Sequence, residues 1–166
     1  MNKKISIALS WLCVLITMMI IFFFSAENGE KSSETSQKVV EKVLETVMNK
    51  DKITLEIIQK YQLPIRKLAH FCIYMLLGFS LANAYRVTLS KFIYLPYIVA
   101  FPSAIIYAIS DEIHQNFSAG RAPSIKDVLI DSCGALTGIL VYFWMCVLIC
   151  HVISKIKYKN KKHPKS

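Results

Sequence analysis

The sequence predicts an all-α integral membrane protein: a bundle of four transmembrane helices, with an extracytoplasmic amphipathic-helical segment after the first span. The first observation is composition, since 54% of the 166 residues are apolar and the mean hydropathy is +0.42. The second is clustering, because the apolar residues form blocks and not the scattered pattern of a soluble domain. The length fits a single domain over residues 1–166. The predicted spans lie near residues 5–24, 68–85, 92–110 and 128–150.

The third observation is the placement of charge, which carries a formal net value of +9. If Lys3 and Lys4 lie inside, the inner segments hold half of the 20 basic residues and none of the acidic ones. This asymmetry follows the positive-inside rule, so both termini are predicted to be cytoplasmic. The basic tail, residues 151–166, is expected to lie against anionic lipid head groups. A nucleic-acid partner is therefore not needed to explain the charge, and none is expected.

The first block, residues 5–24, contains no charged side chain. Twenty such residues in a helix are long enough to cross a hydrocarbon core of roughly 30 Å. The alternative is a signal peptide, because the Asn-Lys-Lys start resembles a basic n-region. The apolar run is longer than a usual signal core, and Phe24-Ser25-Ala26 is a poor cleavage site. We therefore expect a retained helix.

The segment 25–66 is predicted to lie outside the membrane. Apolar residues recur at helical spacing from Thr35 to Met48, which predicts an amphipathic helix capped by the serines at 32 and 33. A second short helix is expected over residues 54–61. Pro64 is expected in the first turn of the next helix, where its missing N–H is harmless. We interpret these pieces as a cover on the bundle or its outer surface, with a substrate lid as the alternative.

Polar side chains share one face of the second predicted span. Lys67, His70 and Tyr74 are spaced i, i+3 and i+7, which places them on the same side of a helix. The structural alternative is a snorkelling lysine and a core histidine. We keep both interpretations open, because the histidine has polar neighbours on its own face.

The densest run of ionisable and amide side chains is DEIHQNFSAGRAPSIKDVLID, residues 111–131. Charge at or within a bilayer is costly and usually functional. Asp111, His114 and Gln115 are predicted to share a helix face, with Glu112 near Gln115. Arg121 follows Gly120 in a predicted turn, and its guanidinium suits a carboxylate or a phosphate. The alternative for Arg121 is an ion pair with one of the neighbouring acids.

The last predicted span begins with Ser124-x-x-Asp127, which fits a capping box. Asp131 lies one turn further on the same face, and Gly134 and Gly138 continue it. Small residues allow helices to approach closely. The acidic face of this helix is therefore expected to point into the bundle.

These side chains are predicted to converge at the outer face of the membrane. A histidine beside carboxylates can act as a general base, and basic groups can hold a phosphate or polarise an oxygen. No cofactor is expected. A metal held by His70, Asp111, Glu112 and His114 is open by ligand type, but no spacing demands one. The candidate catalytic residues are His70, Asp111, Glu112 and His114; the candidate binding residues are Lys67, Tyr74, Gln115, Arg121, Asp127 and Asp131.

Four pieces of the chain form a combined pattern: FFSAENG at 23–29, RKLAHFCIYMLLG at 66–78, SDEIHQNFSAGRAPSIKD at 110–127 and DVLIDSCGALTG at 127–138. With these pieces, the chain resembles the VanZ-like family of bacterial membrane proteins. It departs from the family pattern at Ala119, where proline is frequent, and at Asp131, where asparagine is common. The family's namesake is linked to resistance to teicoplanin-type glycopeptide antibiotics. The resemblance therefore implies a role in the bacterial cell envelope, without implying a mechanism.

Two further functions are consistent with the residues. One is a membrane-embedded enzyme acting on a lipid or lipid-linked cell-wall substrate at the outer face. The other is a small transporter or proton relay through the acidic cluster. A purely structural polar network is the alternative to all of them. The expected partners are the bilayer and a lipid-linked cell-wall precursor or a glycopeptide, and the oligomeric state is left open.

Overall fold

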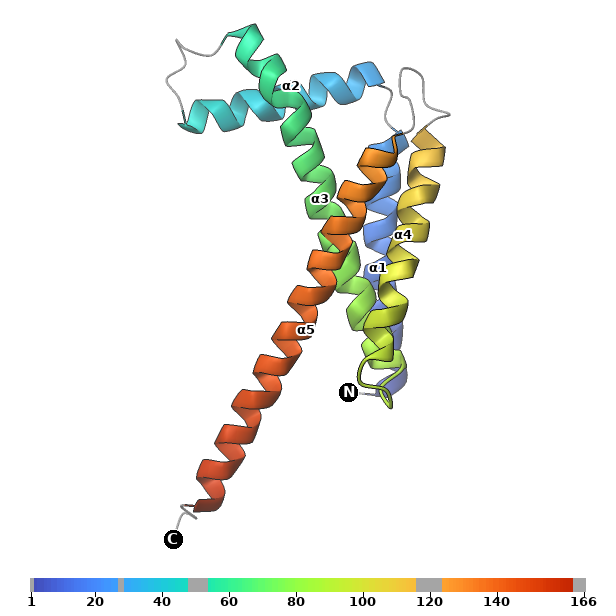
Figure 1. Cartoon of the computed structure of the whole chain (residues 1–166), viewed down its shortest axis with the longest axis vertical. Helices are drawn as coiled ribbons and strands as arrows, with labels where there is room; N and C mark the ends of the chain where they lie inside the picture. Colours follow the sequence, from blue (N-terminus) through green and yellow to red (C-terminus); the bar gives the residue numbers. More distant parts are fainter. Residues whose placement is uncertain (1, 27–28, 48–53, 116–123, 163–166) are drawn as a thin grey trace.

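A computed structural model describes residues 2–26, 29–47, 54–115 and 124–162 of the chain (Figure 1). These residues form five helices and no strand, so the all-α prediction is confirmed. Helices cover all four of the predicted apolar blocks, and one additional helix follows the first block. The helices are α1 (Lys3–Ala26), α2 (Gly29–Val47), α3 (Leu55–Thr88), α4 (Leu95–Gln115) and α5 (Ile125–Lys162).

Three helices are long and apolar enough to cross a membrane: α1, α3 and the part of α5 up to Tyr158. The chain is therefore a multi-pass membrane protein. Helix α4 is different because its apolar part ends at Ser110, before the acidic pair at Asp111 and Glu112. Residues 95–110 are about 24 Å long as a helix, which is shorter than a hydrocarbon core of roughly 30 Å.

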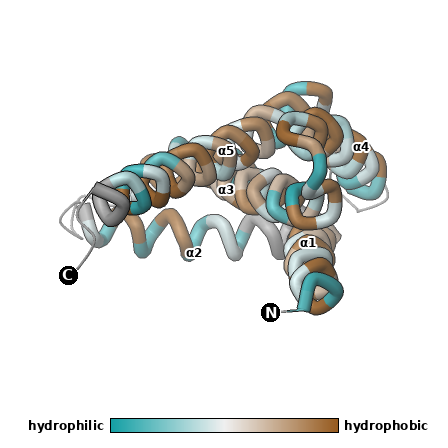
Figure 2. The backbone as a smooth tube through the Cα atoms, turned by 90° about the horizontal axis from the view of Figure 1, so that it is seen from below, coloured by the Kyte–Doolittle hydropathy of each residue, from teal (hydrophilic) through white to brown (hydrophobic). Residues whose placement is uncertain are grey.

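Helices α1, α3, α4 and α5 form the bundle, and α2 lies across one end of it (Figure 1). Hydrophobic residues predominate on the bundle helices, whereas α2 alternates between hydrophilic and hydrophobic residues (Figure 2). Large apolar side chains point outward, as at Phe23, Ile106 and Trp144, which are each 60% exposed or more. Such outward apolar faces suit contact with lipid chains, since all backbone hydrogen bonds of a helix are internal.

Close backbone contact joins α3 to α5. A Cβ added at Gly78 would clash with the backbone of Ala135, and one at Gly138 would clash with that of Met75. Gly134 similarly faces the backbone of Phe71. The expectation that small residues turn the acidic face of α5 into the bundle is confirmed.

Helix α2 packs on the first turns of α3 through a small core of Val40, Leu44 and Ile58. The amphipathic pattern was interpreted correctly, but α2 begins at Gly29, so the serines at 32 and 33 do not cap it. The prediction of a separate helix over residues 54–61 was wrong. Helix α3 is continuous from Leu55 to Thr88 and contains Pro64 in its interior.

Two features explain why α3 continues through this proline. The side chain of Thr54 accepts a hydrogen bond from the backbone N–H of Ile57, which fixes the start of the helix before Pro64. Ile58 and Ile65, on either side of the proline, pack in the same small core against α2. Tertiary packing therefore holds the helical turns that the proline weakens.

The prediction that the last helix ends near residue 150 was also wrong, because α5 continues to Lys162. Between residues 150 and 162 there is no glycine or proline, and lysine is a good helix former that is favourable near a helix C-terminus. The start of α1 and the end of α5 both lie on the side of the bundle opposite α2 (Figure 1). The turn between α3 and α4 lies at this same end, since Lys3 Nζ donates to Ser90 Oγ at 3.1 Å.

Candidate functional site

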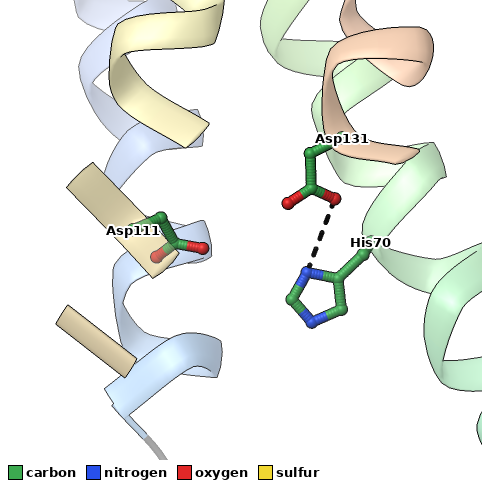
Figure 3. Close-up of side chains that lie close together, drawn as sticks. All are labelled: His70, Asp111 and Asp131. Carbon is green, nitrogen blue, oxygen red and sulfur yellow. Dashed lines mark ion pairs between the residues drawn. The ribbon is translucent and has the colours of Figure 1, made fainter. Parts of the chain in front are cut away.

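A polar cluster lies at the end of the bundle nearest to α2, where three helices each contribute one side chain. His70 comes from α3, Asp111 from α4 and Asp131 from α5 (Figure 3). One donor atom of each lies within 4.8 Å of the donor atoms of the other two. His70 Nδ1 is 3.8 Å from Asp131 Oδ1. The structure therefore brings together three residues that are far apart in the sequence.

Asp111 is held by hydrogen bonds from two helices. Its Oδ2 accepts from Ser25 Oγ at 2.9 Å and from Gln115 Nε2 at 3.2 Å. Gln115 Nε2 is also 3.2 Å from Ser25 Oγ, and all three side chains are buried. Sequence reasoning missed Ser25 as a site residue. The sequence did contain one indication of this role: Ser25 is a polar residue that directly follows three phenylalanines, at the end of the first apolar block.

Glu112 is buried and caps α5 from the neighbouring helix. Its Oε1 accepts from the backbone N–H of Ser124 at 2.5 Å. The predicted capping box assigned this role to Asp127, and that prediction was wrong. Asp127 instead pairs with Lys67 Nζ at 2.9 Å. An acid from α4 replaces the local one because α4 ends beside the positive end of the α5 dipole.

Three buried oxygen atoms in this region have no hydrogen-bond partner among the described residues: Tyr74 Oη, Asp127 Oδ1 and Asp131 Oδ1. The two carboxylate atoms belong to the ion pairs with Lys67 and His70. Tyr74 is fully buried, and Asp131 is 2% exposed. The Tyr74 ring lies 6.3 Å from that of Tyr107, one turn before Asp111 on α4. The helix face predicted for Lys67, His70 and Tyr74 therefore points toward α4 and α5.

His114 lies apart from the cluster, with its ring stacked on Phe22 of α1 at a centroid distance of 4.6 Å. Asp111 and Gln115 also contact α1, through Ser25, so all three side chains lie on the side of α4 that faces α1, as expected from their spacing. Arg121 falls in residues 116–123, outside the described residues.

Two cavities adjoin the cluster. A polar cavity of about 20 Å³ is lined by Lys67, Glu112, Gln115, Asp127, Ile130 and Asp131, together with Arg66 and His70. An apolar cleft of about 250 Å³ lies between α1, α2 and α3. Arg66 and His70 line both, so the cleft and the polar cavity meet at these two side chains. Phe24, Val39, Ala69 and Ile73 supply part of the apolar wall of the cleft.

This arrangement offers two kinds of chemistry. Arg66 and Lys67 can hold an anion beside an apolar cleft, which is the combination that a lipid phosphate requires. An imidazole within reach of a buried carboxylate can also move a proton, as a general base does. The polar cavity has room for a single water molecule or ion.

These features define a small multi-pass membrane protein with a polar cluster at one end of its bundle. The chain belongs to the VanZ/LLP1 family, whose sequence model matches residues 10–149. The matched range contains all of the clustered residues and both cavities, so the resemblance predicted from the sequence is confirmed. Comparisons with curated proteins and with solved structures give no significant match.

Proposed function

We propose that this chain is a cell-envelope protein that holds a lipid or lipid-linked phosphate at the outer face of a bacterial membrane. The observation that carries the proposal is the meeting of the apolar cleft and the polar cavity at Arg66 and His70. The cleft accepts a hydrocarbon chain, and Arg66 and Lys67 bind the phosphate beside it. Lowered susceptibility to teicoplanin-type antibiotics, implied by the resemblance, follows if the bound lipid belongs to the cell-wall pathway.

The proposal includes four membrane crossings, with α4 as the short third one, and both termini on the cytoplasmic side. The basic residues of the N-terminus, the α3–α4 turn and the α5 tail support this topology, because they occupy the end opposite α2 (Figure 1). A short α4 is accommodated by local thinning of the bilayer or by its neighbours. Its final turn, with Asp111 and Glu112, then lies at the outer head groups and is covered by protein.

The test is teicoplanin susceptibility in a sensitive Gram-positive host that expresses the chain at matched membrane abundance. Ala69→Trp fills the apolar cleft, since Ala69 lines it. Leu68→Trp adds the same bulk one residue earlier, where the side chain is 60% exposed and does not line the cleft. We expect the wild type and Leu68→Trp to protect, and Ala69→Trp to lose protection.

The outcomes separate the parts of the proposal. Equal protection by both tryptophan variants would show that the cleft is not the site. A wild-type chain that gives no protection would remove the teicoplanin role, and binding of a polyprenyl phosphate to the purified chain would then test the lipid site directly. Loss of that binding in Ala69→Trp alone is the expected result.

An enzyme acting on the same lipid-linked substrate is the second candidate. It is favoured by the imidazole of His70, which lines both cavities and lies 3.8 Å from the Asp131 carboxylate. The candidate acids Asp111 and Glu112 lie nearby, and both are buried. Turnover of a lipid-linked precursor by the wild type, but not by His70→Asn, would support catalysis. If the wild-type chain binds the precursor but does not convert it, the enzyme hypothesis fails and the lipid-binding function remains.

Transport through the bundle is less favoured. The buried acidic side chains among the described residues, Asp111, Glu112 and Asp131, gather at one end. Beyond them, α3 and α5 meet backbone to backbone at Gly78 and Gly138. The next polar contact along the α3–α5 interface is the hydrogen bond of 3.1 Å from Tyr142 Oη to Asn83 Oδ1. An ion or proton would have to pass the backbone contacts at Gly78 and Gly138 to move between this contact and the acidic cluster.

A further inference from the structure

We propose that His70, Asp111 and Asp131 bind one divalent cation of the Zn²⁺ or Mn²⁺ class at the junction of α3, α4 and α5. The three side chains supply one imidazole nitrogen and two carboxylate oxygens, which is a ligand set that both metals accept. The set differs from the one considered from the sequence, because Asp131 takes the place of Glu112 and His114.

The geometry is close to that of a bound ion. The three donor atoms lie within 4.8 Å of one another. Metal–ligand distances of about 2.0–2.2 Å place two ligand atoms about 3.4 Å apart in a tetrahedral site. The donor atoms therefore have to approach one another, which rotation of the three side chains can provide. Figure 3 shows the Asp111 carboxylate facing the His70–Asp131 pair across the gap between the helices.

Burial provides a second, independent reason. Asp131 is 2% exposed, lines the polar cavity of about 20 Å³, and its Oδ1 has no hydrogen-bond partner in the described part of the chain. A buried polar atom without a partner is costly, and a cavity of this size holds one water molecule or ion. The hydroxyl of Tyr74, one turn from His70, is buried without a partner as well.

The charge balance also favours a cation. Asp111 and Asp131 are two carboxylates at most 4% exposed, on adjacent helices in a region of low dielectric. Lys67, the nearest lysine on α3, is paired with Asp127. Arg66 faces the polar cavity from the same helix, and Glu112 adds a third acid from α4. A divalent ion between the carboxylates offsets both charges at once, whereas a proton on His70 offsets one.

The surroundings resemble the outer shell of a metal site. Metal ligands are usually held in place by further hydrogen bonds. Ser25 and Gln115 hold Asp111 in this way through its Oδ2. The cation site does not rest on the proposed lipid function, because Ala69→Trp fills the cleft and leaves all three ligands intact.

The experiment measures metal uptake by the full-length chain, purified in detergent without a histidine tag. After treatment with a chelator, the protein is dialysed against Zn²⁺ or Mn²⁺, and bound metal is counted by mass spectrometry and titration calorimetry. We expect about one equivalent in the wild type and at least tenfold weaker binding in Asp131→Asn and His70→Asn. His151→Asn, which changes an exposed histidine at the far end of α5, controls for adventitious binding and should match the wild type.

Two results would overturn the proposal. The first is a folded wild-type chain that takes up no metal, a result that does not depend on how the variants fold. The second is binding that is lost in His151→Asn and retained in Asp131→Asn. Either one would assign His70, Asp111 and Asp131 to a network held by shared protons. Ala69→Trp should bind metal normally whether or not it has lost its lipid.

Discussion

The hydroxyl of Ser25 donates a hydrogen bond of 2.9 Å to the carboxylate of Asp111, which ties the end of α1 to the end of α4. Both side chains are buried, at 0% and 4% exposure. The end of the first apolar block thereby becomes a wall of the polar cluster. Because α2 follows α1 in the chain, this hydrogen bond also holds the end of α1 from which the chain continues to α2.

Ser25→Ala is expected to destabilise the bundle. The change removes one donor to a buried carboxylate, which typically costs about 1–3 kcal/mol. Thermal or detergent-titrated unfolding of the purified chain measures the effect. Ser110→Ala is the matched control, because Ser110 is exposed and its hydroxyl donates within its own helix, to the backbone carbonyl of Tyr107. Equal stability of the two variants would contradict a structural role for the Ser25 contact.

Gly138→Ala is expected to destabilise the chain even though alanine is the better helix former. In an exposed helix the change would gain about 1 kcal/mol. Here the added methyl group meets the backbone of Met75, so α3 and α5 must separate. Overpacking of this kind costs about 1–3 kcal/mol. Leu140→Ala, which alters a half-exposed side chain on the same helix, should be nearly neutral in the same unfolding assay.

The proposed topology predicts the side of the membrane on which each segment lies. A reporter fused after residue 45, in α2, should report the extracytoplasmic side. Reporters at Ser90, in the α3–α4 turn, and after the last lysine should both report the cytoplasm, because the basic groups lie there. A cytoplasmic signal after residue 45 would overturn the topology. Opposite signals at Ser90 and the C-terminus would show that only one of α4 and α5 crosses, and α4, the shorter apolar helix, would then be the one that does not.

The sequence was sufficient to predict the apolar helical blocks and the inward face of α5, but not the contacts of the site. Hydrophobic periodicity and composition are local properties of the chain. They were therefore enough to predict the helical blocks and the face of α5 that carries Gly134 and Gly138. The bond from Ser25 to Asp111 and the cap that Glu112 gives to Ser124 join residues on different helices. Such contacts depend on how α1, α4 and α5 pack, which no local pattern contains.

The extents of α3 and α5 illustrate the same limit in another way. Pro64 is a reasonable place to begin a helix, yet packing against α2 carries α3 through it. The basic tail has the composition of a solvated segment, yet it continues α5 to Lys162 because nothing in it stops a helix. In both cases the local sequence favoured a helix boundary. For α3, packing against α2 outweighed that preference, and for α5, the helix propensity of the tail did.

The ion pair between Lys67 and Asp127 provides a test that separates binding from structure. Its N–O distance is 2.9 Å, but the side chains are 42% and 34% exposed, so the pair should contribute at most about 1 kcal/mol. Lys67→Ala is therefore expected to leave membrane abundance nearly unchanged. It should nevertheless lower both lipid binding and protection, because Lys67 lines the polar cavity beside Arg66.

The exchanged double variant, Lys67→Asp with Asp127→Lys, restores the pair but moves the positive charge from α3 to α5. If Lys67 binds a phosphate, the exchange should recover stability without recovering lipid affinity, since the ammonium no longer adjoins Arg66. If the pair is only structural, each single variant should lower abundance, and the exchange should restore abundance and protection together. Unfolding, lipid titration and susceptibility measured on the same four proteins distinguish these outcomes, because they place the loss either in the fold or in the site.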